Sequence, residues 1–122
     1  MRLILAILPT MLLVVYGQLI IKWRVGALAE VAQPASGPLG RLVVYVTDPY
    51  ILSAYVAALA SSFTWMFVVE SHPVSLAFPL HIGLTVIAVV AGGIYLFGEP
   101  ITAPRILAVA LIVAGIAIGS RS

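Results

Sequence analysis

The sequence predicts an all-α membrane protein in which four transmembrane helices form a single domain. Hydrophobic residues make up 63% of the 122 residues, whereas charged residues make up 8%. A soluble domain carries about 25% charged residues, so this chain has too few to cover a surface that faces water. Its apolar runs have the length that a bilayer requires, about 20 residues. Within the domain 1–122 we expect spans at about 3–22, 50–69, 74–97 and 104–120.

The first apolar run begins after Arg2 and ends before Lys22 and Arg24. A secretory signal peptide is the competing interpretation, because the small residues at 27–29 resemble a cleavage site. The run is too long for a signal peptide, and the two basic residues interrupt the approach to that site. We therefore predict a retained transmembrane helix.

Residues 25–49 differ from the rest of the chain, because they hold three prolines and three glycines. This composition cannot span a bilayer, and residues 34–40 are typical of a turn-rich loop. We expect residues 39–46 to lie along the membrane interface, with Arg41 and Tyr45 at the level of the lipid headgroups.

The second span, residues 50–69, carries small polar side chains that can hydrogen-bond to a helix backbone or to a neighbouring helix: Ser53, Ser61, Ser62 and Thr64. Trp65 lies near the exit of this span. A short connection then leads to the third span.

The third span, residues 74–97, contains no charged residue unless His81 is protonated. Its 24 residues would extend about 36 Å as a helix, enough to cross a hydrocarbon core of about 30 Å. Pro79 removes a backbone donor and is expected to kink the helix. Membranes tolerate such a kink where a neighbouring helix or a cavity satisfies the freed carbonyl, so we predict that this helix lines a functional site. A lipid-facing span with an incidental proline is the alternative.

The fourth span, residues 104–120, is short and rich in small residues. Two pairs are spaced four residues apart: Ala110 with Ala114, and Gly115 with Gly119. Such pairs let helix backbones approach closely in membranes. We expect this helix to mediate dimerisation, and packing within its own chain is the alternative.

Basic residues encode the membrane orientation weakly. With both chain ends outside the cytoplasm, four basic residues face inside: Lys22, Arg24, Arg41 and Arg105. The reverse orientation places two inside, so the first orientation is slightly favoured. Dual insertion remains an alternative.

The composition also excludes several functions. Without cysteine there is no disulfide and no thiolate metal site. The net charge of +2 is too small and too scattered to suggest nucleic-acid binding. No motif pairs a nucleophile with a base or forms a phosphate-binding glycine loop. We therefore expect no enzymatic activity, no cofactor and no metal site.

Several motifs follow one another in a recognisable order: Gly17-Gln18-Leu19 with Lys22, PVSLAFP at 73–79, Phe97-Gly98-Glu99-Pro100, and Arg105 with Gly115. In this order the chain resembles the drug/metabolite transporter superfamily, in its small four-helix, EamA-like form. It is most similar to the single-repeat group that includes the subunits of the flippase for aminoarabinose-phospho-undecaprenol. The small multidrug resistance exporters are more distantly similar.

This resemblance implies a transporter or flippase subunit in a bacterial-type inner membrane. Its substrate would be a lipid-linked molecule of the polyprenyl-phosphate sugar type, moved by alternating access. The expected partner is a second copy or a similar small subunit. We expect structural roles for six residues: Gly17, Pro79, Glu99, Arg105, Gly115 and Gly119. Of these, Glu99 and Arg105 are expected to pair across the turn or to cap a helix end.

One departure from the multidrug exporters argues against their activity. Those exporters carry a glutamate in the first span, three residues before the glycine matched by Gly17, and here that position is Val14. None of the four acidic residues lies within a span, so proton-driven export of cationic drugs is not expected. An exporter that uses His81 instead is the first alternative function, and a non-transporting scaffold subunit is the second.

Gln18 and Lys22 are four residues apart and therefore share one face of the first helix. That face is apolar with a cationic tip, which suits a lipid with a phosphate head and a long hydrocarbon tail. Lys22 supplies a point charge for the phosphate. Alternatively, Lys22 and Arg24 extend to the interface as anchors, which is the interpretation favoured for Arg24.

His81 lies about eight residues into the third span, and an ionisable residue at membrane depth is a functional candidate by default. It can hydrogen-bond a sugar or phosphate, or relay a proton. Alternatively, it bonds a neighbouring helix or the carbonyl freed by Pro79. Phe78 lies on the same side of the helix. Tyr16 and Trp65 complete the expected substrate contacts.

Overall fold

The computed structural model describes residues 2–32, 37–119 and 121, and all five of its elements over these residues are α-helices. They are α1 (Arg2–Ala32), α2 (Gly37–Val46), α3 (Pro49–Ser71), α4 (Val74–Phe97) and α5 (Ala103–Gly119). The predicted all-α fold is therefore confirmed for the described residues. The segments Arg2–Ala29, Pro49–Ser71 and Val74–Phe97 are long and apolar enough to span a membrane.

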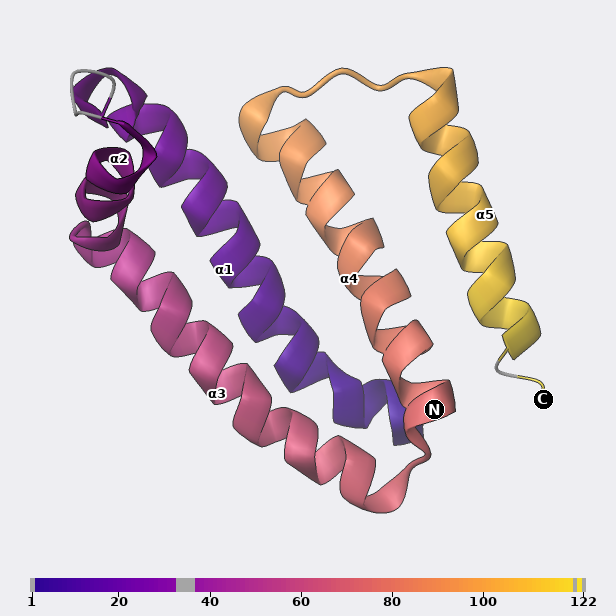
Figure 1. Cartoon of the computed structure of the whole chain (residues 1–122). Coiled ribbons are helices and arrows are strands. Elements are labelled where there is room, and N and C mark those ends of the chain that lie inside the picture. The colour runs from indigo at the N-terminus through magenta and orange to yellow at the C-terminus, as the bar shows by residue number, and fades with distance from the viewer. Residues whose placement is uncertain (1, 33–36, 120, 122) are drawn as a thin grey trace.

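Helix α1 lies between α3 and α4 and makes most of its contacts with these two helices (Figure 1). Helix α3 runs back alongside α1, and α4 then returns in the direction of α1. A small core forms where α1 begins and α3 leads into α4, built from Ile7, Val68, Ala77 and Leu80. Helix α5 packs against α4 and against no other described helix.

The stretch 25–49, expected to be a loop, is largely helical. Helix α1 continues to Ala32, because alanine, leucine and glutamate favour helix and the next proline comes after it. Helix α2 begins at Gly37, within the expected loop 34–40, and residues 34–36 lie outside the described residues. With 31 residues, α1 is about 46 Å long and exceeds the thickness of a hydrocarbon core.

Helix α2 leaves an apolar stripe exposed, formed by Leu39, Leu42 and Val43. Helix α3 then begins with Asp48 as its N-cap and a proline in its first turn. The Asp48 carboxylate accepts a hydrogen bond from the backbone N–H of Ile51 at 3.1 Å, which satisfies one of the donors that a helix start leaves free.

Helix α4 is continuous through Pro79 and ends at Gly98, whose φ of 64° is a left-handed conformation that favours glycine. A short connection then leads to α5. Many large apolar side chains on the outer faces are exposed, among them Leu59, Phe67, Tyr95 and Ile118. In water such a surface would be unfavourable, whereas a hydrocarbon environment would cover it.

Candidate functional site

Five of the six predicted contact residues fall into two separate pockets along α1, and Tyr16 lies outside them. The first, called here the histidine pocket, has a volume of about 310 Å³ and is formed by α1, α3 and α4. Its lining residues are Thr10, Val14, Ser61, Ser62, Trp65, Met66, Phe78 and His81. Three of the predicted contacts, Trp65, Phe78 and His81, therefore lie together.

The aromatic rings of the histidine pocket are centred on Trp65. Its ring centroid is 5.1 Å from that of His81 and 6.2 Å from that of Phe78. The Trp65 and Phe78 rings meet edge to face, with an interplanar angle of 73°. This is a favourable geometry for an aromatic pair. The pocket thus offers an aromatic wall next to an imidazole.

His81 is 7% exposed, and its Nδ1 atom has no hydrogen-bond partner among the described residues. Nδ1 therefore makes neither of the alternative bonds, to a neighbouring helix or to the carbonyl freed by Pro79, in that part of the chain. A buried polar group without a partner is unfavourable, so such a group calls for an explanation. Because Nδ1 is itself covered by protein, a ligand in the pocket would reach it only after the imidazole turned toward the pocket.

The second pocket, called here the lysine pocket, has a volume of about 220 Å³ and lies between α1 and α4. Its lining residues are Gln18, Leu19, Lys22, Val89, Gly93, Phe97 and Glu99. Gln18 and Lys22 come together here, as their four-residue spacing predicts. Glu99 joins them, although sequence reasoning gave it a structural role.

Glu99 reaches the lysine pocket because the chain reverses at Gly98. Its backbone N–H donates to the Gly93 carbonyl at 3.3 Å, and its carboxylate lies against the Gly93 Cα. A Cβ at position 93 would overlap a carboxylate oxygen of Glu99. Glycine at 93 therefore provides the space that the carboxylate occupies.

Arg105 takes a different partner from the one expected. Its guanidinium donates to the Pro100 carbonyl at 2.9 Å, so it holds the turn before α5. Within the described ranges, the ion pair is Arg24 with Asp48, and Glu99 is not paired with Arg105. Both Glu99 and Arg105 nevertheless line a further cavity of about 260 Å³ between α4 and α5.

The remaining predicted residues lie outside both pockets. The Tyr16 hydroxyl is 2.7 Å from Ser53 Oγ and joins α1 to α3. At Gly17 the two helices approach closely, since a Cβ there would lie 3.4 Å from the Ala54 carbonyl oxygen. A cavity of about 100 Å³ between α4 and α5 is bordered by Pro79, Gly115 and Gly119.

Sequence reasoning did not identify the role of Arg24. Its guanidinium forms two hydrogen bonds with the Asp48 carboxylate, at 2.9 and 3.1 Å. It also lies 4.9 Å from the ring centroids of both Trp23 and Tyr50, which favours cation–π attraction. The hydrogen bonds from Arg24 hold the pKa of Asp48 below its usual range. This cluster ties the second half of α1 to the start of α3.

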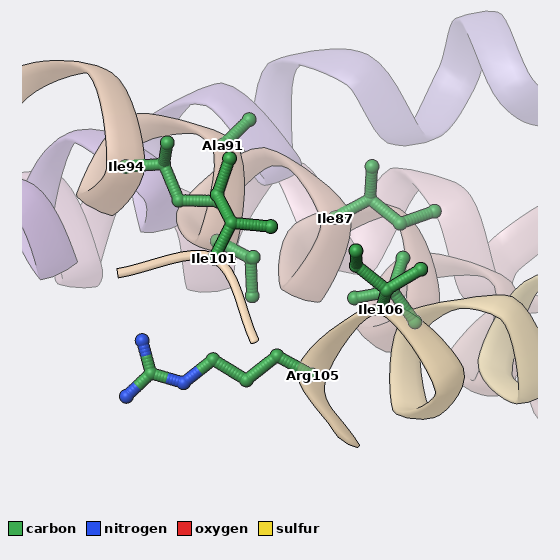
Figure 2. A pocket seen from close by; sticks show the side chains of 8 residues that line it. Ile87, Ala91, Ile94, Ile101, Arg105 and Ile106 are labelled. Atoms are coloured by element: carbon green, nitrogen blue, oxygen red, sulfur yellow. The ribbon is translucent and has the colours of Figure 1, made fainter. Parts of the chain in front are cut away.

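An apolar cavity of about 260 Å³ also lies between α4 and α5. Apart from Arg105, its wall consists of isoleucine, valine and alanine side chains, and the Arg105 guanidinium extends away from Ile87 and Ile106 (Figure 2). Such a wall can accommodate hydrocarbon but offers nothing to orient a polar ligand. We therefore place the candidate site in the histidine and lysine pockets.

Comparisons of this chain with protein-family models, with curated proteins and with solved structures find no match. The fold and the pockets define a helical protein with three helices long and apolar enough to span a membrane. Two pockets with polar side chains lie between these helices. The resemblance to the drug/metabolite transporter superfamily remains a prediction.

Proposed function

We propose that this protein is a multi-pass transporter or flippase subunit of a bacterial-type inner membrane. Its substrate is a phosphate-bearing lipid of the polyprenyl-phosphate sugar type. The observation that carries the proposal is the lysine pocket, where Gln18 and Lys22 meet at the point where the apolar run of α1 ends. A lipid phosphate lies at that depth while its hydrocarbon tail stays in the membrane.

The arrangement of the two pockets supports movement of a polar headgroup. Val14 in the histidine pocket and Lys22 in the lysine pocket are eight residues apart on α1, about 12 Å along the helix axis. A headgroup that leaves Lys22 would need polar partners deeper in the membrane, since unsatisfied polar groups are costly there. His81 and the hydroxyl groups of Ser61 and Ser62 supply such partners.

Transport further requires that α5 act as the fourth span and that two subunits assemble. Helix α5 has no buried residue over its described range, 103–119. The described helices enclose little volume, so a translocation path is more readily formed between two subunits than within one. We propose a homodimer or a heterodimer with a similar small subunit, operating by alternating access.

The test is the binding and flipping of a polyprenyl-phosphate glycolipid in proteoliposomes. A charge-assisted contact is worth about 1.5–3 kcal/mol, so Lys22→Ala should weaken binding roughly tenfold to a hundredfold. Lys22→Arg should retain part of the activity, because it keeps the charge and changes the geometry. Gln18→Ala should cost less, about 1 kcal/mol for a neutral hydrogen bond.

If Lys22→Ala binds and flips the lipid like the parent protein, Lys22 is an interface anchor and the proposed phosphate site is wrong. Two alternatives give different results. An exporter that uses His81 would confer drug resistance that is lost in His81→Ala. A scaffold subunit would transport nothing and would change the activity of an enzyme that co-purifies with it.

A further inference from the structure

We propose that Glu99 is a proton-binding residue of the lysine pocket, and that it takes up a proton when an anion binds at Lys22. This inference rests on the proposed function, because it requires a phosphate group to bind in that pocket. It assigns to Glu99 a role in coupling proton uptake to anion binding, whereas the sequence suggested a structural role.

The first support is the position of the carboxylate. Lys22 lines the pocket of about 220 Å³ from α1, and Glu99 lines it from the connection that follows α4. Their side chains form no ion pair within the part of the chain that the structure describes. The carboxylate is held against Gly93, about four residues before the end of α4, instead of extending into the loop. The pocket therefore contains one cation and one anion with space between them.

The second support is the small number of charges around Glu99. On the α1 side the facing groups are Gln18, which is neutral, and Lys22. On the α5 side the facing group is Arg105, whose guanidinium bonds the Pro100 carbonyl. Helix α3 contributes no residue to either cavity. Glu99 is therefore the one acidic residue in the lining of the lysine pocket that a ligand anion would face.

The consequence follows from the size of the pocket. A phosphate bound at Lys22 brings a negative charge close to the Glu99 carboxylate, and like charges in one site favour protonation of one of them. Glu99 then accepts one proton from the aqueous phase, and its carboxylate becomes a neutral acid. The neutral acid can donate a hydrogen bond to a phosphate oxygen. By linkage, anion binding and proton uptake favour each other.

The experiment measures binding of a polyprenyl-phosphate glycolipid to the full chain in detergent between about pH 5 and 8. Its phosphodiester does not change charge over this range, so any change in affinity comes from the protein. We expect the affinity to increase as the pH falls, by up to about tenfold per pH unit for one linked proton. In a weakly buffered solution, binding should remove up to one proton per lipid.

Two variants test whether the pH dependence of lipid binding comes from Glu99. Glu99→Gln should bind tightly at every pH, and both histidines remain present in it. Gly93→Ala keeps the charge but displaces the carboxylate, so it should reduce the pH dependence. Gly26→Ala is the matched control, because a Cβ at position 26 meets no atom within 4 Å. A pH dependence that persists unchanged in Glu99→Gln or in Gly93→Ala overturns the assignment.

The result also separates this inference from the proposed function. Binding that depends on Lys22 but not on pH would leave the phosphate site in place and overturn the proton coupling. The absence of binding by the unmodified protein at every pH would overturn both.

Discussion

At the scale of single residues, His81 is the feature that packing alone explains least. It is buried, its Nδ1 atom has no partner among the described residues, and it contacts Trp65. Such an atom costs roughly 1–3 kcal/mol when it stays unsatisfied. A residue kept for stability would be expected to avoid this cost, whereas a ligand-binding residue would recover it when its imidazole turns toward a bound ligand.

We therefore expect His81→Phe to preserve or increase stability while it slows lipid flipping. Thermal unfolding in detergent measures the first effect and proteoliposome flipping the second. Thr85→Val is the matched control, because Thr85 Oγ1 is also buried without a partner among the described residues but does not line the pocket. It should be stabilising and leave flipping unchanged. Loss of stability with unchanged flipping in His81→Phe would indicate a structural residue.

Asp48 gives a second prediction, which concerns pH. Hydrogen bonds from Arg24 keep its pKa below the usual value, so its stabilising contribution is complete above about pH 4. That contribution is lost as the pH falls through the lower pKa of the folded protein. Asp48→Asn should therefore unfold at a lower temperature than the parent at neutral pH, with the difference shrinking in acid. A difference that is constant with pH would exclude the ion pair as its cause.

The sequence predicted part of the candidate site for simple geometric reasons. Gln18 and Lys22 share a helix face, so their spacing was enough to bring them together. Glu99 enters the same pocket because the chain reverses at Gly98 and because Gly93 leaves room for its carboxylate. Neither condition is visible in a pattern of hydrophobic residues. The Arg24–Asp48 pair was missed because it depends on where α1 ends relative to α3.

At the scale of the helices, hydrophobic runs predicted the long elements well and the connecting segment poorly. Residues 25–32 extend α1, although their glycine and the nearby prolines suggested a loop. Local helix propensity favours this extension, and the Arg24 contacts join α1 to the N-cap of α3 just before it begins. Helix packing likewise depends on how closely two helices approach each other, as at the glycines in α4, and a hydropathy pattern does not show this.

Gly83 is the contact point between α4 and α5. A Cβ at this position would overlap the side chain of Ile116. Gly83→Val should therefore overpack the contact and destabilise the protein by about 1–3 kcal/mol. Ile116→Ala in the same protein should restore part of the loss. Thermal unfolding of both variants and of Gly26→Val, as a control without a nearby side chain, tests the contact. No rescue by Ile116→Ala would mean that the two helices pack elsewhere.

At the scale of the whole molecule, the exposed surface of α5 is the basis for the expected dimer. A Cβ at Gly115 or Gly119 meets no atom within 4 Å in this chain. Replacing both glycines with leucine should weaken association, because the added bulk keeps two helix backbones apart. Crosslinking in membranes measures the oligomer, and Gly26→Leu is the control. An unchanged oligomer in the double variant would place the interface elsewhere.

The attachment of α5 to α4 also affects the order in which the protein assembles. Among the described helices, the contacts of α1, α3 and α4 with one another are complete without α5. In the proposed multi-pass protein, these three helices could therefore pack in the bilayer before the ribosome has finished α5. With 17 residues, α5 is about 25 Å long, shorter than the hydrocarbon core of about 30 Å. In the four-span dimer proposed above, its insertion would be a late step, made against α4 and a neighbouring subunit.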